Sequence, residues 1–188
     1  IFSGNILIGE GKSQLDVTSL TPSEKLAKAG IAYILQDKSI FPGMTVEENL
    51  WMGGFLKNQA AESKAAAERV FDKYPQLAAR RRHQAKVLSG GERRLLEISR
   101  ALVMNPDVLL VDEPSIGLEP KFIDMVFEIL NDLQHNEGKT IIMVEQNAKK
   151  GLEFADIGYV MVSGKIAIAG KGSDLLENPK VGELFLGG

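Results

Sequence analysis

The chain has 188 residues, of which 44% are hydrophobic and 25% are charged, and its formal net charge is −3. This composition supplies enough apolar material for one real core, so it excludes a disordered chain. No apolar run approaches the roughly 18 residues that a transmembrane helix requires. The absence of Cys excludes disulfides and thiolate metal sites, and the mild negative charge gives no general attraction to nucleic acid.

The first third of the chain alternates short elements with clear stop signals. Residues 5–20 have the pattern of a small hairpin interrupted by glycines. Thr21, followed by Pro and by Glu24 three residues on, predicts a capped helix that stops at Gly30. The apolar run at 31–35 predicts a buried strand, and it is followed directly by the polar Gln36.

The middle of the chain is expected to be helical. A second capping box, Thr45 to Glu48, opens a helix toward Met52, and residues 60–74 have the apolar stripe of an amphipathic helix. A further helix is predicted over about 92–104, ended by Asn-Pro.

The last third alternates apolar strands with helices. We expect a strand at 108–111 that ends in two carboxylates, a helix at 120–136 that Gly138 ends, and a strand at 140–144 that ends in Glu-Gln. A short helix at 148–154 and a hairpin around Ser163-Gly164 follow. Apolar strands that alternate with helices indicate an α/β fold with a mainly parallel sheet, which we expect to be covered on both faces.

Polar residues stand at the carboxyl ends of three predicted strands, where function gathers in an open parallel sheet. They are Gln36, the pair Asp112 and Glu113, and the pair Glu145 and Gln146. Successive strand residues point in opposite directions, so two adjacent acids cannot do the same job. One acid can hold Mg²⁺ beside phosphate oxygens, and the other can orient a water molecule. A strand end followed by a helix-capping acid would explain the same two residues without any chemistry.

Residues 88–92 read Leu-Ser-Gly-Gly-Glu. Ser89 and Glu92 fit a capping box, but two glycines weaken a first helical turn, so the box alone does not explain them. Paired glycines at a helix start suit the close approach of backbone N–H groups to an anion. The pattern therefore predicts a helix start that recognises phosphate.

These motifs together resemble the ATP-binding subunits of ABC transporters, over nearly the whole chain. Residues 88–92 resemble the signature motif, with Glu where Gln is commonest, and residues 108–113 resemble the Walker B strand. Residues 115–120 resemble the D-loop, and Gln36 resembles the Q-loop. The short sequence segments at 41–50, 144–147 and 185–188 are similar to those in the ATP-binding subunits of branched-chain amino-acid transporters.

The resemblance implies an ATPase core of the P-loop NTPase type, at 1–43 and 101–188, and a helical subdomain with the signature at 44–100. It implies ATP and Mg²⁺ as cofactors, a head-to-tail dimer, a membrane permease as partner, and a place at the cytoplasmic face of the membrane. The site residues carried over by the resemblance are Glu113 for the attacking water, Gln146 for the γ-phosphate, Asp112 and Gln36 for Mg²⁺ and the nucleotide, and Ser89, Gly90, Gly91 and Glu92 for the ATP bound on the partner subunit.

Two departures from the family pattern stand out. Gln146 occupies the switch position, where the family usually has His, and Gln can donate a hydrogen bond but cannot titrate in this range. The sequence also contains no Walker A loop, because Gly11-Lys12-Ser13 has Ile6 where the pattern requires Gly. We read that triplet as a surface turn. The chain is therefore expected to be truncated and inactive by itself.

The truncation leads to a structural expectation. In the resembled fold the Walker A strand lies between the strands at 140–144 and 157–162, so these two should not pair with each other.

Three other functions stay open. An ABC ATPase of DNA repair is disfavoured, since no long coiled coil separates Gln36 from Ser89. A lipopolysaccharide-export ATPase would suit Gly-Glu-Arg-Arg at 91–94, and a non-enzymatic binding module or remnant would suit the missing loop.

Overall fold

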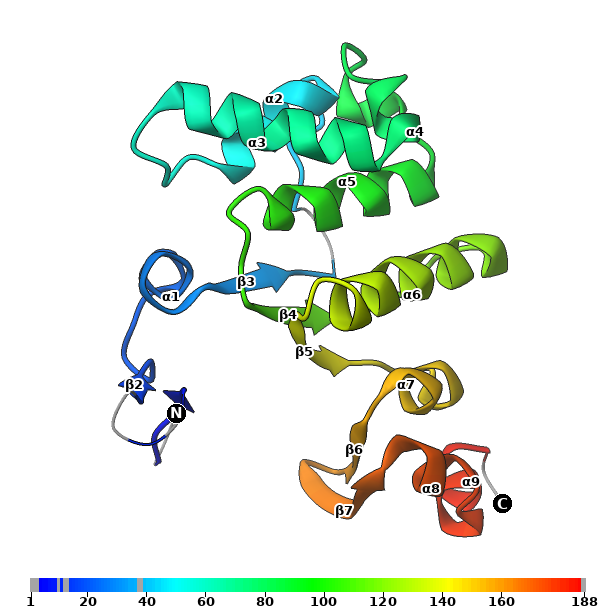
Figure 1. Cartoon of the computed structure of the whole chain (residues 1–188). Helices are drawn as coiled ribbons and strands as arrows, with labels where there is room; N and C mark the ends of the chain where they lie inside the picture. Colours follow the sequence, from blue (N-terminus) through cyan, green and yellow to red (C-terminus); the bar gives the residue numbers. More distant parts are fainter. Residues whose placement is uncertain (1–3, 10, 12–13, 37–38, 187–188) are drawn as a thin grey trace.

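The computed structural model describes residues 4–9, 11, 14–36 and 39–186. Figure 1 shows a layer of helices at the top, a layer of strands and helices in the middle, and a small C-terminal unit below. The elements of the first half are β1 (Leu7–Ile8), β2 (Leu15–Asp16), α1 (Pro22–Ala29), β3 (Ile31–Ile34), α2 (Val46–Gly53), α3 (Ala60–Lys73), α4 (Pro75–Ala78), a 3-10 turn (Ala85–Val87) and α5 (Gly90–Leu102). Those of the second half are β4 (Val108–Asp112), α6 (Pro120–His135), β5 (Thr140–Val144), α7 (Ala148–Phe154), β6 (Ile157–Val162), β7 (Lys165–Lys171), α8 (Gly172–Leu176) and α9 (Pro179–Leu186).

The central sheet is parallel, in the order β3-β4-β5, as the apolar strands predicted. Register pairs Ile34 with Val111 and Asp112 with Val144, so the three strands end within about one residue of one another. The carboxyl ends therefore meet at one edge of the sheet. None of the helices in the described residues is both long and apolar enough to cross a membrane.

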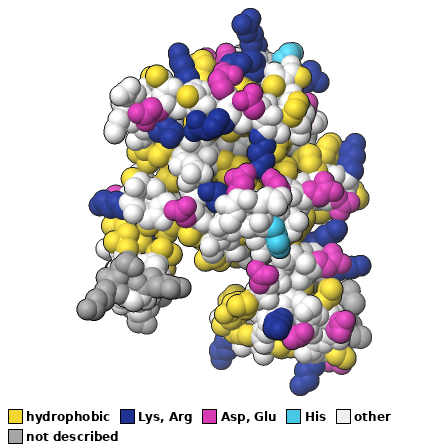
Figure 2. Space-filling model, viewed as in Figure 1, with side chains coloured by type: hydrophobic (Ala, Val, Ile, Leu, Met, Phe, Trp, Pro, Cys, Tyr) yellow, Lys and Arg dark blue, Asp and Glu magenta, His cyan; other side chains and the backbone are white. Residues whose placement is uncertain are grey.

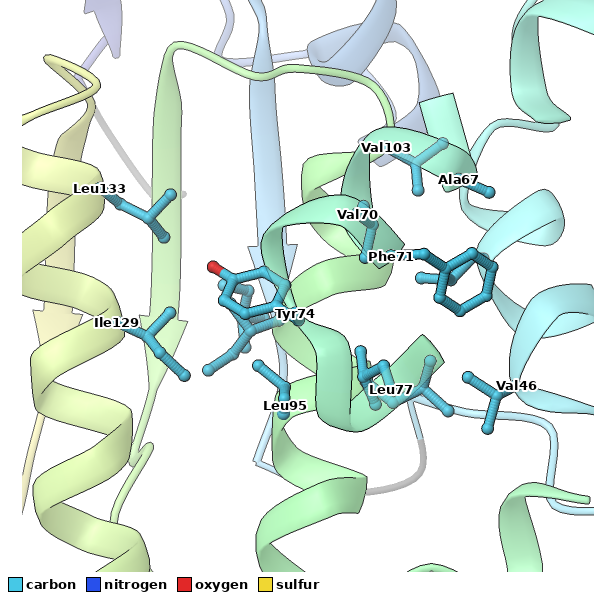
Figure 3. Packing of buried hydrophobic residues seen from close by; sticks show 14 of the residues in the cluster. Val46, Ala67, Val70, Phe71, Tyr74, Leu77, Leu95, Val103, Ile129 and Leu133 are labelled. Atoms are coloured by element: carbon cyan, nitrogen blue, oxygen red, sulfur yellow. The ribbon is translucent and has the colours of Figure 1, made fainter. Parts of the chain in front are cut away.

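One face of this sheet packs against the helices. Ala32 and Ile34 of β3, Leu109 and Val111 of β4, and the partly buried Met143 of β5 join the main core with residues of α5 and α6. In Figure 3 Tyr74, at the end of α3, lies between the α6 residues Ile129 and Leu133 and the α5 residue Leu95. The helical layer and the sheet layer therefore share one core.

The other face is not covered as we expected. Val17 and neighbouring residues pack only on its amino end, against Ile31 and Val108. Further along, Tyr33, Ile142 and Val144 are exposed, and the last two expose 57% and 63% of their surface. The prediction of a sheet covered on both faces is therefore wrong for this end, because no described element packs on it.

β5 and β6 do not pair, which confirms the expectation for these two strands. Among the described strands β6 pairs with β7 alone, in an antiparallel hairpin whose turn residues Ser163 and Gly164 have φ values of 49° and 78°. β1 and β2 pair antiparallel, Leu7 with Asp16 and Ile8 with Leu15, which agrees with the hairpin predicted over 5–20. Gly11 has a φ of 54°, while Lys12 and Ser13 of the Gly-Lys-Ser triplet lie outside the described residues.

The predicted helix starts are confirmed by their side-chain hydrogen bonds. Reciprocal capping boxes open α1, α2 and α5, and Gly30 ends α1 in the left-handed region. Two boundaries differ from the prediction. α5 begins at Gly90, two residues early, because Ser89 is its N-cap and the two glycines form its first turn. Gly138 stands two residues beyond the cap Asn136 rather than directly after it.

Candidate active site

Three of the predicted site residues meet at the carboxyl edge of the sheet. Asp112 is the last residue of β4, Glu113 follows it, and Gln36 follows β3. The side-chain Nε2 of Gln36 donates a hydrogen bond of 3.1 Å to Oε2 of Glu113. The backbone amide of Glu113 donates to the carbonyl oxygen of Val144 at 2.8 Å, which carries the β4-β5 pairing one step past the strand. The predicted convergence of these strand ends is therefore real.

Glu113 has an unusual backbone. Its φ is 41°, in the left-handed region that non-glycine residues rarely adopt. Such strain collects at functional sites, where the surrounding structure determines it. Here the bond to Val144 and the bond from Gln36 hold the residue on both its backbone and its side chain. The turn changes the direction of the chain directly after Asp112.

Gln146 lies at the same edge, and no hydrogen bond among the described residues joins it to Gln36, Asp112 or Glu113. It follows β5, next to β4 in the sheet, and its side chain is exposed. The structure therefore brings Gln36, Asp112 and Glu113 together, and it leaves Gln146 free to face a ligand.

The signature residues form the start of α5. Ser89 Oγ accepts a bond from the amide of Glu92 at 3.3 Å, and the Glu92 carboxylate accepts from the amide of Ser89 at 2.9 Å. The bond from the Ser89 amide, together with the partner Arg80 at 3.2 Å, holds the pKa of Glu92 below its usual value. Glu92 thus serves the fold as a cap. The amides of Gly90 and Gly91 begin the helix, where no intrahelical acceptor exists.

The two glycines have different surroundings. A Cβ on Gly91 would lie 2.1 Å from Cδ1 of Phe122 on α6, so this position has a packing reason to be glycine. A Cβ on Gly90 would have only Leu118 near it, at 3.9 Å. Anion recognition was our reason for both glycines, but packing alone explains Gly91. Gly90 is the position that still needs a functional reason.

Arg94 is a residue that the sequence reasoning missed. Its nearly buried guanidinium pairs with Glu97 at 2.9 Å and donates to the carbonyl oxygen of Leu35 at 2.8 Å, with a longer contact of 3.5 Å to that of Asp112. It therefore ties α5 to the ends of β3 and β4. The available signal was a pair of opposite charges, three residues apart, on the apolar face of an amphipathic helix.

The acidic and amide oxygens fit a hard cation held largely by phosphate. Among the described residues, no three His, Asp or Glu side chains gather into a metal-binding cluster. Mg²⁺ needs no such cluster, since it is usually held by one or two carboxylates with water and phosphate oxygens. The exposed carboxylate of Asp112 suits this role. Gln36, which donates through Nε2, keeps its Oε1 for a further partner.

Comparison with known proteins decides the family. A sequence model described as ABC transporter matches residues 1–116, and these include Gln36, the signature and the Walker B strand. The chain belongs to the ABC transporter family. It is 41% identical over 167 residues to the high-affinity branched-chain amino acid transport ATP-binding protein BraG of Pseudomonas aeruginosa, covering 89% of this chain and 71% of that one.

Two further relatives show the range of the family around this ABC chain. A probable branched-chain amino acid transport ATP-binding protein LivF of Archaeoglobus fulgidus is 37% identical over 187 residues, covering 100% of this chain and 77% of its own. The lipopolysaccharide export system ATP-binding protein LptB of Haemophilus influenzae is 31% identical, covering 90% and 70%. The resemblance drawn from the motifs is therefore confirmed, and the family is that of ABC-type ATPases.

Solved structures confirm the fold of this ABC chain. The ADP conformation of MJ1267, an ATP-binding cassette of an ABC transporter, matches with a TM-score of 0.76 at 30% identity, over 93% of this chain and 74% of that one. A nucleotide-free ATP-binding cassette matches with a TM-score of 0.74 at 30% identity, over 91% and 74%. The α/β core with a helical signature layer is thus the ABC cassette fold.

Proposed function

We propose that the edge formed by Gln36, Asp112, Glu113 and Gln146, together with a phosphate-binding Walker A loop, hydrolyses ATP to power import of branched-chain amino acids through a membrane permease. The observation that carries this proposal is the 3.1 Å bond between Gln36 and Glu113, which brings together residues that end two neighbouring strands. Phosphoryl transfer depends on positioning and charge neutralisation rather than on covalent chemistry, and this arrangement supplies the positioning.

Each residue has a separate part in the proposed reaction. Asp112 and the Oε1 atom of Gln36 would hold Mg²⁺, which neutralises phosphate charge when bound. Glu113 would accept a hydrogen bond from the attacking water and orient it. Gln146 would donate its amide to the γ-phosphate. The carboxylate of Glu113 is held by Gln36 in advance, so its orientation changes little before the reaction.

The start of α5 would act across a dimer interface. Ser89 and the amides of Gly90 and Gly91 would meet the γ-phosphate of ATP bound to a second, head-to-tail subunit. Two features support this part. The first amides of a helix favour anions, and α5, with 13 residues, is long enough to have a dipole. Binding ATP between two subunits would link closure of the dimer to ATP and its opening to hydrolysis.

ATP hydrolysis also requires the phosphate-binding loop that the sequence lacks. We therefore propose that the 188-residue chain binds ATP–Mg²⁺ poorly and does not hydrolyse it, and that an N-terminal extension with a Walker A loop restores both. The test is to measure ATP affinity by calorimetry and hydrolysis by phosphate release, for the 188-residue chain and for the extended chain. Micromolar ATP affinity of the 188-residue chain, or no hydrolysis by the extended chain, would overturn this assignment.

A groove beside the site supports a permease as partner. It encloses about 330 Å³ between α1 and β3 on one side and α2 and α5 on the other. Its lining includes the exposed side chains of Leu35, Phe41, Met52 and Phe55. In Figure 2 hydrophobic side chains gather where the helical layer meets the layer below it. We propose that an amphipathic helix of the permease docks here, which would place the subunit at the cytoplasmic face of the membrane.

Arg100 contributes a positive charge to the lining of this groove. Its guanidinium lies 4.9 Å from the centre of the Phe41 ring, and burial lowers its pKa. Glu97 also lines the groove and partly offsets this charge, and no ion pair within 4.0 Å joins Arg100 to an acid among the described residues. We propose that this cation attracts an acidic side chain of a partner. In the extended chain, Phe55→Asp should abolish co-purification with the permease and leave the ATPase rate of the free subunit unchanged. Retained co-purification would argue against this groove.

The relatives support the proposed substrate class, which is open to a direct test. The relatives named for branched-chain amino acids are 41% and 37% identical, and the one named for lipopolysaccharide export is 31% identical. Because permease and binding protein choose the substrate, the test is uptake of labelled leucine by vesicles that hold the extended chain with its permease. ATP-dependent leucine uptake is expected. Hydrolysis without leucine uptake would favour the export function instead.

A further inference from the structure

Glu145 accepts three hydrogen bonds that join two segments of the site. Its Oε1 accepts from the hydroxyl of Ser115 at 2.8 Å and from the backbone amide of Asn147 at 2.9 Å, and its Oε2 accepts from the amide of Ser115 at 3.2 Å. Ser115 is buried, two residues after Glu113. One carboxylate therefore links the segment that follows β4 to the segment that follows β5.

This link fixes the backbone on both sides of Gln146. On one side, Glu145 is anchored to Ser115. On the other side, the side chain of Asn147 caps α7 by accepting from the amide of Lys150 at 3.2 Å. The Lys150 ammonium in turn donates to Asp124 on α6 at 2.8 Å. Gln146 is thus an exposed side chain on a backbone that is held from two directions.

We propose that Glu145 is a positioning residue, which holds Gln146 at a fixed place relative to Glu113 by binding Ser115 and Asn147. The proposal rests on the function proposed above, in which Gln146 meets the γ-phosphate. Both oxygens of Glu145 accept hydrogen bonds from Ser115 or Asn147, so its carboxylate is oriented toward the backbone of these two segments. It acts through Gln146, because an amide that donates to phosphate works only when its position is set in advance.

The chemistry of the anchor suggests a graded set of variants. Glu145→Gln keeps the size of the side chain but replaces one acceptor oxygen by an NH₂ donor. In either orientation this NH₂ faces a backbone amide, that of Ser115 or that of Asn147, which also donates. Ser115→Ala removes one of the three bonds and leaves the two backbone amides in place. Glu153→Gln makes the same chemical change on α7, where the ion pair of Glu153 among the described residues is a long contact of 3.9 Å with Lys149. It is the matched control.

Hydrogen exchange tests the anchor in the 188-residue chain, without ATP. Glu145→Gln should speed exchange of the Ser115 and Asn147 amides by about tenfold, the effect of one lost hydrogen bond to a charged group. Ser115→Ala should speed exchange at Asn147 less than Glu145→Gln does, and Glu153→Gln should leave both amides unchanged. Unchanged exchange at Asn147 in Glu145→Gln would overturn the anchor.

Steady-state kinetics of the extended chain tests the positioning role. Glu145→Gln should lower kcat about tenfold at an unchanged KM for ATP. The lost hydrogen bond should also lower the melting temperature by about 3–5 °C, so kcat is measured at a temperature where the variant stays folded. Gln146→Ala should add little to that loss in the double variant, since both changes remove the same contact. The positioning role would be overturned if the loss of kcat in the double variant equalled the product of the two single losses. An equal loss of kcat in Glu153→Gln would also overturn it. No hydrolysis by the unsubstituted extended chain would overturn the proposed function, while the exchange experiment would still decide the anchor.

Discussion

Gln36 donates a hydrogen bond to Glu113 at 3.1 Å, although 77 positions separate the two residues in the sequence. The bond crosses from the end of β3 to the end of β4, and it reaches a glutamate whose φ of 41° already turns the chain away from the strand. The orientation of the Glu113 carboxylate therefore depends on a second strand. Any ligand that draws Gln36 toward itself would release or redirect that carboxylate.

The first prediction concerns Glu113 in the extended chain. Glu113→Gln should abolish ATP turnover and keep ATP binding, because the substitution removes the carboxylate that orients water and leaves Asp112 in place. It should also favour a stable ATP-bound dimer, since hydrolysis no longer opens it. Phosphate release and size-exclusion chromatography with ATP are the measurements. Glu128→Gln, an exposed position on α6, is the control, and wild-type turnover in Glu113→Gln would remove Glu113 from the catalytic role.

The second prediction separates packing from function at the two signature glycines. Gly91→Ala should cost about 1–3 kcal/mol of unfolding free energy, because the new methyl group would overlap the ring of Phe122. Gly90→Ala should stay within about 0.5 kcal/mol of the parent, since its nearest neighbour is 3.9 Å away. Urea unfolding of the 188-residue chain measures both.

A compensating substitution and an activity assay complete that comparison. Phe122→Leu should recover part of the stability lost in Gly91→Ala, because it removes the ring that the methyl group meets. In the extended chain, Gly90→Ala should lower ATP turnover without lowering the melting temperature, since the added methyl group would obstruct phosphate at the helix start. Full activity of Gly90→Ala would leave that glycine without a functional reason.

Much of the fold could be predicted because its signals are local. Each capping box sits within four residues, and Ser163-Gly164 specifies its turn by itself. The strand ends Gln36, Asp112 and Glu113 were found because an apolar run stops at a polar residue. The prediction that these residues lie close together rested on the rule that parallel strands end at one edge of a sheet, and not on any signal between particular residues.

The unpredicted features depend on contacts between distant parts of the chain. Nothing near Gly91 in the sequence indicates that Phe122, on another helix, fills the space above it. The bonds from Ser115 to Glu145 span 30 positions, and those of Arg94 reach two strand ends. The exposed face of β5 was missed for the same reason, because an apolar run shows that a strand can be buried but not which element covers it.

The third prediction concerns the buried pair of Arg94 and Glu97. Glu97→Leu should cost about 3–5 kcal/mol, because it leaves the guanidinium of Arg94 buried without its counter-charge. Adding Arg94→Met should recover a large part of that cost, since an apolar pair of similar volume needs no desolvation of charge. Chemical denaturation of the single and double variants gives the coupling between the sites. A double variant as unstable as the sum of its parts would show that the bonds of Arg94 to Leu35 and Asp112, rather than the pair, carry the stability.

The last prediction concerns acid pH and the capping boxes. The pKa of Glu24 is lowered to about 2, first by the hydrogen bond from Lys28 and then by those from Thr21, and the pKa of Glu48 is lowered by bonds from Thr45. A carboxylate whose folded pKa is depressed stabilises the fold fully above its unfolded pKa, about 4.5 for Glu, and this contribution is lost as pH falls through the folded value. The unfolding free energy should therefore fall between about pH 5 and pH 2.

The two carboxylates should respond differently when the charged partner is removed. Lys28→Met should raise the pKa of Glu24, because its largest cause is an exposed ion pair, and 1 M salt should do the same by screening. The pKa of Glu48 should not move in either experiment, since backbone and hydroxyl groups of Thr45 hold it. Carboxyl ¹³C shifts followed from pH 6 to pH 1.5 measure both residues in one sample. A parallel rise at Glu48 would mean that general charge on the protein, rather than the local bonds of each cap, sets these pKa values.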